Sequence, residues 1–108
     1  MIRLVRTCNA CPEQYDAFLG ENQIGYFRLR HGHFRVDYPD VGGKTILETY
    51  PEGDGEFTLD ERDFQLYAAC LILLIHHKKS LQDPTSPVWQ PHILIHAARS
   101  YTVEEKGE

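Results

Sequence analysis

Three arginines and a histidine near a short turn are the side chains with the clearest capacity for chemistry. Between Gly25 and Tyr38 the sequence reads GYFRLRHGHFRVDY, in which polar and apolar residues alternate. The candidate binding residues in this stretch are Tyr26, Arg28, Arg30, His33 and Arg35. Guanidinium groups bind phosphate and carboxylate through paired N–H donors, and Tyr26 offers a ring that can stack on a base. The set therefore predicts a site for an anion.

The alternation determines how the two halves of this segment pair. A two-residue His31-Gly32 loop is the simplest hairpin connection, since Gly readily takes a positive φ and His tolerates it better than most residues. This register places Arg28 opposite Arg35, whereas a three-residue loop would move Phe34 among the arginines. Because side chains alternate with a period of two, such a slip is costly. The apolar face of the predicted hairpin consists of Phe27, Leu29, Phe34, Val36 and Tyr38.

The cationic face has two interpretations. Like charges opposite one another are mildly destabilising unless another group neutralises them, which favours a pocket for an anionic ligand such as a nucleotide, or for an acidic patch on a partner protein. The alternative is the solvated outer face of a sheet that packs on one side only. In that case Asp37, with Asp16 or Glu48 on neighbouring strands, would complete a charge ladder.

Cys8 and Cys11 form a CxxC motif followed by Pro12. Two thiolates at this spacing can bind one zinc ion, but a structural zinc site needs four ligands and the chain has no second CxxC. His31 and His33 would supply the missing pair if the strand order brings the hairpin turn over the first loop. Structural thiols in a turn and a redox pair are the other interpretations. A small zinc-stabilised module is thus the alternative function.

Other motifs give little support for a metal site or for catalysis. His92 and His96 would share one face of a helix, but no third ligand follows at a readable spacing and HExxH is not formed. The acidic run from Glu52 to Asp63 does not fit an EF-hand loop. No GxSxG, P-loop or GxGxxG sequence occurs. We therefore expect a protein that is not an enzyme and that has no cofactor other than the zinc considered above.

The elements that position these residues are strands in the first half of the chain and a helix in the second. Alternating runs predict strands over residues 2–7, 14–18, 24–30, 33–38 and 44–50, the last at a sheet edge. Thr58 and Glu61 fit a capping box, which predicts a helix from about Leu59 to about Lys79. Its middle is apolar on all sides and needs a second cover besides the sheet. The C-terminal segment or a second copy of the chain, as a homo-oligomer, would supply it.

Together these elements predict a single α+β domain over residues 1–108. An antiparallel sheet of four to five strands, a meander with a tight hairpin, occupies residues 1–50. One long helix over residues 58–79 packs against it. The structure of residues 80–108 is left open between helix and strand, and the final EEKGE is expected to be frayed.

Composition bounds the function. The chain of 108 residues is 42% hydrophobic and 25% charged, which suits one globular domain with a hydrophobic core. Residues 1–50 carry six basic and six acidic side chains, whereas residues 51–108 carry five and ten. The excess of acidic side chains in residues 51–108 argues against non-specific binding to DNA or to an anionic membrane, because both need a net positive surface. Without a signal peptide or a bilayer-spanning run, and with three cysteines, the chain is expected in the cytoplasm.

The stretch CNACPEQYDAF…GYFRLRHGHFRVDYPDVGG…GDGEF…DER, over about residues 8–65, resembles small uncharacterised proteins of bacterial phages and other mobile elements. The resemblance rests on G-Y-x-R-L-R-H-G and Y-P-D and includes no catalytic signature. It implies a non-enzymatic accessory protein, of a kind that binds a host or defence component or sequesters a nucleotide signal. No functional residue carries over from it. The leading interpretation is a stoichiometric binding protein with the cationic face as its working surface.

Overall fold

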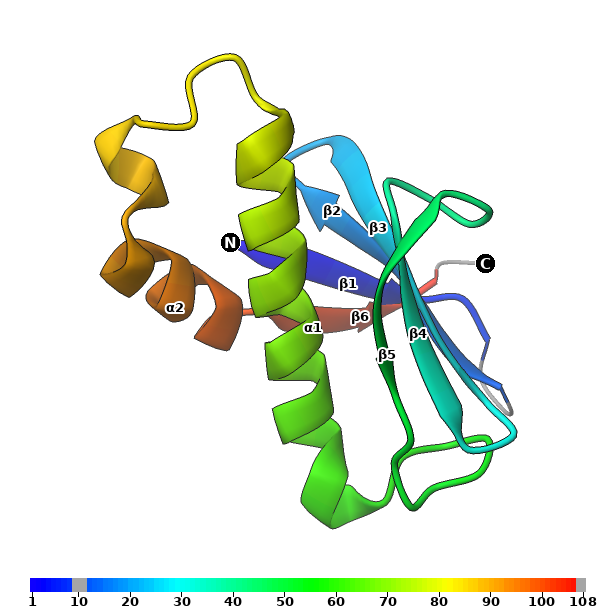
Figure 1. Ribbon diagram of the computed structural model, residues 1–108. Helices are drawn as coiled ribbons and strands as arrows, with labels where there is room; N and C mark the ends of the chain where they lie inside the picture. The colour runs from blue at the N-terminus through cyan, green and yellow to red at the C-terminus, as the bar shows by residue number, and fades with distance from the viewer. Residues whose placement is uncertain (9–11, 107–108) are drawn as a thin grey trace.

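The protein is a two-layer α+β structure in which one face of a single sheet carries the helices. The computed structural model describes residues 1–8 and 12–106. Along the chain the elements are β1 (Ile2–Arg6), β2 (Glu13–Leu19), β3 (Asn22–Arg30), β4 (His33–Tyr38), β5 (Lys44–Thr49), α1 (Leu59–Ser80), the short 3₁₀ helix η1 (Pro87–Trp89), α2 (Pro91–Arg99) and β6 (Thr102–Glu105). The strands lie in the order β5-β4-β3-β2-β1-β6. Figure 1 shows both α-helices on the same side of this sheet, so no described helix covers its opposite face.

The predicted fold class and the long helix are confirmed, but the sheet prediction is wrong in two respects. The described part of the chain forms six strands rather than four or five. β6 pairs in parallel with β1, so the sheet is mixed and not fully antiparallel. The segment of undetermined structure forms α2 followed by β6, and Glu104 and Glu105 belong to a strand rather than to a frayed tail. All four residues of β6 are exposed, so its sequence carries no alternating burial pattern that would reveal it.

The hairpin between β3 and β4 has the predicted register. Arg28 is the partner of Arg35, and Arg30 is the partner of His33. His31 and Gly32 both have positive φ angles, of 54° and 70°, as a type I′ turn requires. Of the predicted apolar face, Phe27, Leu29, Phe34 and Val36 are completely buried, while Tyr38 is partly buried and its hydroxyl lies 3.0 Å from His77 Nδ1 of α1. The opposite side chains of both strands, the arginines among them, therefore point to the side of the sheet without helices.

The start of α1 is fixed to the loop that precedes it. The Glu61 carboxylate accepts hydrogen bonds from the backbone N–H groups of Thr58, Glu52 and Gly53, each at 2.8 Å. The first is the predicted capping box, and the other two hold the preceding loop against the helix. Burial acts to raise the pKa of Glu61, but these N–H groups outweigh it, and the pKa lies below its ordinary value. The helix begins at Leu59, as expected.

The apolar middle of α1 is covered from two sides. Its buried residues Leu66, Leu73 and Leu74 share one hydrophobic core with the sheet and with Leu94 and Ala98 of α2. The C-terminal segment therefore supplies the second cover that the composition of α1 requires, while assembly with a second copy stays a prediction. Neither described α-helix is both long and apolar enough to cross a membrane.

The helix passes very close to the sheet at Gly25. A Cβ atom at this position would lie 2.7 Å from Cδ2 of Leu73. We expect Gly25→Ala to lower the free energy of unfolding by about 1 kcal/mol, because the added methyl group overpacks the contact. Urea unfolding measures the effect. In a Leu73→Ala background the same substitution should cost less, and an equal cost in both backgrounds would contradict the close contact.

Candidate anion-binding site

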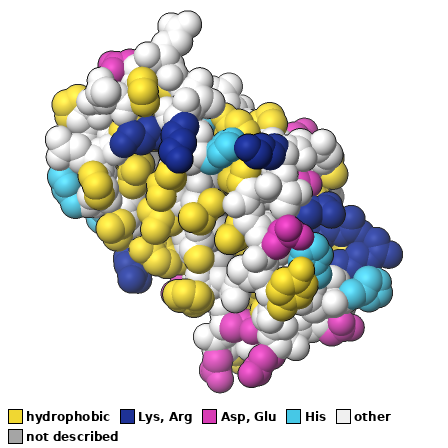
Figure 2. Space-filling model, in the orientation of Figure 1, with side chains coloured by type: hydrophobic (Ala, Val, Ile, Leu, Met, Phe, Trp, Pro, Cys, Tyr) yellow, Lys and Arg dark blue, Asp and Glu magenta, His cyan; other side chains and the backbone are white. Residues whose placement is uncertain are grey.

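The predicted cationic face lies opposite the buried side chains of the hairpin, and Figure 1 shows that both α-helices lie on the other side of the sheet. We use this name for the outer side chains of the hairpin, namely Arg28, Arg30, His33 and Arg35. Together with His31 they line an open depression of about 420 Å³. Figure 2 shows dark-blue and cyan side chains gathered at the right-hand edge of the molecule, at the hairpin end of β3 and β4. The structure thus brings the predicted arginines and His33 into one depression.

Arg28 and Arg35 form the centre of this face. The Nε atom of each is buried and makes no hydrogen bond within the described part of the chain. Arg35 Nε lies 3.3 Å from Asp37 Oδ1, close enough for an ion pair, although its N–H is not aligned for a hydrogen bond. No described carboxylate makes an ion pair with Arg28 or Arg30. The face therefore carries positive charge that its described neighbours neutralise only in part.

Tyr26 lies beneath the surface of the cationic face. Its side chain is only 8% exposed, and its hydroxyl donates a hydrogen bond of 3.1 Å to Gln14 Oε1. Burial raises the pKa of this hydroxyl, while the positive charges of Arg28 and Arg35 oppose the shift. The ring is therefore not open to a ligand, which differs from the stacking role expected from the sequence.

An exposed aromatic ring, that of Tyr50, stacks instead on His33, one of the residues that line the depression. The rings of His33 and Tyr50 stack with their centroids 5.1 Å apart and their planes 16° apart, and Tyr50 is 77% exposed. His33 Nε2 also lies 2.8 Å from Glu48 Oε1. The sequence alone did not identify Tyr50 as a neighbour of His33. The contact follows from the pairing of Phe34 with Thr49, which places Tyr50, the residue after Thr49, beside His33.

The loop before α1 borders the cationic face at the hairpin turn. The N–H of Gly32 donates to the Asp54 carbonyl, and the N–H of Glu13 donates to the Gly55 carbonyl, both at 2.7 Å. A second depression of about 410 Å³ continues from the first between turn and loop, lined by Pro12, Arg28, Arg30, His31, Asp54 and Gly55. These backbone contacts hold the turn in place and set the Asp54 side chain at the border of the cationic region.

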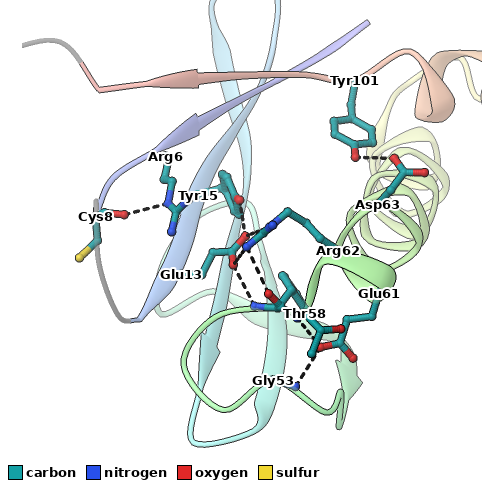
Figure 3. A network of polar contacts seen from close by, with 11 residues as sticks. Arg6, Cys8, Glu13, Tyr15, Gly53, Thr58, Glu61, Arg62, Asp63 and Tyr101 are labelled. Carbon is teal, nitrogen blue, oxygen red and sulfur yellow. Dashed lines mark hydrogen bonds and ion pairs between the residues drawn. The ribbon is translucent and has the colours of Figure 1, made fainter.

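A buried ion pair holds the same end of the sheet on its helix side (Figure 3). Glu13 is fully buried and accepts hydrogen bonds from Arg62 Nε and Nη2 at 2.9 and 3.0 Å. It also accepts one from the Phe57 N–H at 3.0 Å and one from the Tyr15 hydroxyl. Burial acts to raise the pKa of Glu13, but the hydrogen bonds from Arg62, Tyr15 and Phe57 outweigh it, so the pKa lies below its ordinary value. This pair joins β2 to the first turn of α1.

Sequence patterns alone do not reveal the Glu13–Arg62 pair. Glu13 lies on the same side of β2 as the buried residues Tyr15 and Ala17, so an acidic residue in phase with the core was the available signal. Its partner Arg62 follows 49 positions later along the chain. Only the packing of α1 against the sheet brings the two together.

The predicted zinc ligands are not brought together within the described residues. Cys8 is partly buried, and Cys11 lies outside the described residues. No group of three or more His, Cys, Asp or Glu side chains suited to a metal ion occurs in residues 1–8 and 12–106. The register does place the end of β1, the start of β2 and the His31-Gly32 turn at the same end of the sheet. Zinc binding by Cys8 and Cys11 stays a prediction.

The described geometry suits binding of an anion better than it suits the other chemistries considered. Buried polar donors in native proteins are nearly always paired, and a water or an ion is one of the partners that can satisfy a donor that the protein itself leaves unpaired. A phosphate or carboxylate above Arg28 and Arg35 would offer oxygen acceptors to both guanidinium groups. Comparison of the chain with protein-family models, with curated proteins and with solved structures finds no match.

Proposed function

We propose that this chain is a non-enzymatic binding protein whose cationic face takes an anionic ligand or an acidic surface of a partner protein. The observation that carries the proposal is the Arg28–Arg35 pair. Two like charges lie opposite one another, with buried Nε atoms that make no hydrogen bond to the described residues, on the face that no described helix covers. A bound anion would relieve the repulsion and accept hydrogen bonds from the guanidinium groups.

The charge-ladder interpretation accounts for less of the face. Asp37 lies beside Arg35 and also accepts a 2.7 Å hydrogen bond from Thr45, so its charge is shared. Glu48 pairs with His33. Neither makes an ion pair with Arg28, so the ladder is incomplete at the centre of the face. This gap favours a ligand over a purely solvated surface.

The wider role follows the resemblance to phage and mobile-element proteins. Such a role is stoichiometric, as in an anti-defence protein of the cytoplasm that sequesters a nucleotide signal or covers an acidic site on a host protein. The excess of acidic side chains in residues 51–108 disfavours broad attraction to nucleic acid. Recognition would therefore be local to the cationic face.

Thermal unfolding in pyrophosphate tests the small-ligand form of the proposal. We expect pyrophosphate to raise the melting temperature of the wild type, since a ligand held only by the folded state stabilises it by about 2.7 kcal/mol at one hundred times Kd. Arg28→Met combined with Arg35→Met should abolish the shift. Arg3→Met is the matched control, because Arg3 projects from the same face of the sheet but pairs with Glu104 at 3.0 Å. Sodium chloride of equal ionic strength corrects for general screening.

A pull-down from the native host tests the protein-partner form. We expect a captured protein to be lost with the double arginine variant and retained with Arg3→Met. A pyrophosphate shift that persists in the double variant would contradict an anion site on this face. No shift, together with no partner that depends on the two arginines, would overturn the proposal.

The zinc-stabilised module built on Cys8 and Cys11 is the second candidate. The end of β1, which precedes Cys8, lies at the same end of the sheet as the turn that carries His31, and this favours the candidate because that turn holds further zinc-binding side chains. Metal analysis of protein purified without a histidine tag tests it. Less than stoichiometric zinc, with an unchanged melting temperature in chelator, would reject this candidate.

A further inference from the structure

The exposed ring of Tyr50 adjoins the arginine pair on the same face of the sheet. Tyr50 stacks on His33, and His33 lies two residues from Arg35 along β4. Neighbouring positions on one face of a strand are about 7 Å apart, and neighbouring strands are about 5 Å apart. An aromatic surface and a pair of guanidinium groups therefore lie within the reach of one small molecule.

We propose that the ligand of the cationic face is a nucleotide, with its phosphate at Arg28 and Arg35 and its base stacked on Tyr50. This inference rests on the proposed function and adds the chemical class of the ligand. A base has an apolar π face, which an exposed aromatic ring binds with little dependence on base identity. The stacked His33 ring holds Tyr50 in place, so less freedom is lost when a base lies on it.

The neighbouring carboxylates determine how the nucleotide is oriented on the cationic face. Glu48 of β5 contacts His33, and Asp37, two residues beyond Arg35 along β4, contacts Arg35. Their negative charge keeps a phosphate toward the Arg28 side of the arginine pair, because Arg28 makes no ion pair with a described carboxylate. The Tyr50 ring, which stacks on His33 at the rim of the depression, is then left for the base, with the ribose between.

In this arrangement Tyr50, and not Tyr26, supplies the ring that stacks on the base. Tyr26 is 8% exposed and cannot meet a base, whereas Tyr50 is 77% exposed. A large aromatic side chain that the fold leaves in water and holds against a neighbouring ring is available for contact with a ligand. Inorganic phosphate or an isolated carboxylate would leave Tyr50 unused.

Calorimetric titration with matched ligands tests the inference. The probes are the four ribonucleoside 5′-monophosphates, ribose 5-phosphate, adenosine and a short single-stranded oligonucleotide. We expect at least one monophosphate to bind about tenfold or more tightly than ribose 5-phosphate, the contribution of stacking. Tyr50→Ala should remove this difference and leave ribose 5-phosphate binding unchanged, while Tyr50→Phe should keep it. Tighter binding of the oligonucleotide than of every monophosphate would assign the nucleotide to a single strand rather than to a free metabolite.

The outcomes separate this inference from the proposed function. Equal binding of the monophosphates and ribose 5-phosphate, lost in the double arginine variant, would overturn the nucleotide assignment and leave the anion site in place. A monophosphate preference that survives in Tyr50→Ala would also overturn it. No binding of any phosphate compound to the wild type would overturn the inference, and the pull-down would then decide the proposed function. Circular dichroism checks that the Tyr50 variants fold.

Discussion

Replacing Arg62 with methionine should destabilise the protein by about 3–5 kcal/mol, because it leaves a buried carboxylate without its partner. Arg62 donates two hydrogen bonds to Glu13, which has no exposed surface. The methionine retains most of the length of the side chain, so the loss comes from charge and hydrogen bonding rather than from a large cavity. Urea unfolding at neutral pH measures the change.

The same substitution should reverse the contribution of Glu13 to the pH dependence of stability. In the wild type the pKa of Glu13 is below its ordinary value, so its stabilisation is present above the unfolded pKa and is lost as the pH falls through the folded pKa. Without Arg62, burial dominates and the pKa of Glu13 rises above the unfolded value. Protonation then favours the folded state. The deficit of Arg62→Met relative to wild type should therefore shrink as the pH is lowered from neutral toward about 4.

Two controls identify the buried charge as the cause. The double variant Glu13→Leu with Arg62→Met should recover much of the lost stability, because a buried ion pair can be replaced by apolar side chains at little cost. Tyr15→Phe removes one neutral donor to Glu13 and should cost less than Arg62→Met. A deficit that stays constant with pH, or a double variant as unstable as Arg62→Met, would contradict the assigned role.

The parts of the fold that could be predicted are those specified by neighbouring residues. Alternation on both sides of His31-Gly32 allowed a single register for the hairpin, and the Thr58–Glu61 pair marked the start of α1. β6 escaped prediction because its position depends on the free edge of β1, nearly the whole chain away, and because its residues are all exposed. A parallel pairing between the ends of a chain leaves no local pattern.

The candidate site likewise has a part that could be predicted from the sequence and a part that could not. The arginines could be placed on one face from the period of the strands alone. That Tyr50 rather than Tyr26 offers the exposed ring could not be predicted. The burial of Tyr26 depends on its packing within the sheet, and the exposure of Tyr50 depends on where β5 ends. The Glu13–Arg62 pair likewise requires α1 to be docked before the two residues meet. Contacts between distant elements are the part that sequence patterns do not encode.

Arg28→Met should raise the stability of the ligand-free protein by about 1–2 kcal/mol, the opposite of the usual effect of removing a partly buried side chain. The substitution removes a buried Nε donor without a hydrogen bond and the charge that faces Arg35, while the methionine keeps the apolar stem in place. Because both arginines share the repulsion, Arg35→Met in the Arg28→Met background should gain less than it gains alone, which a double-mutant cycle from urea unfolding measures.

Addition of pyrophosphate should then reverse this order of stability, since only the wild type retains the site. On a binding surface, unfavourable interactions such as the Arg28–Arg35 repulsion are relieved only when the ligand binds. On a structural surface they are relieved by the fold itself. A loss of stability in Arg28→Met without ligand would mean that the arginines support the fold and would count against a binding role for this face.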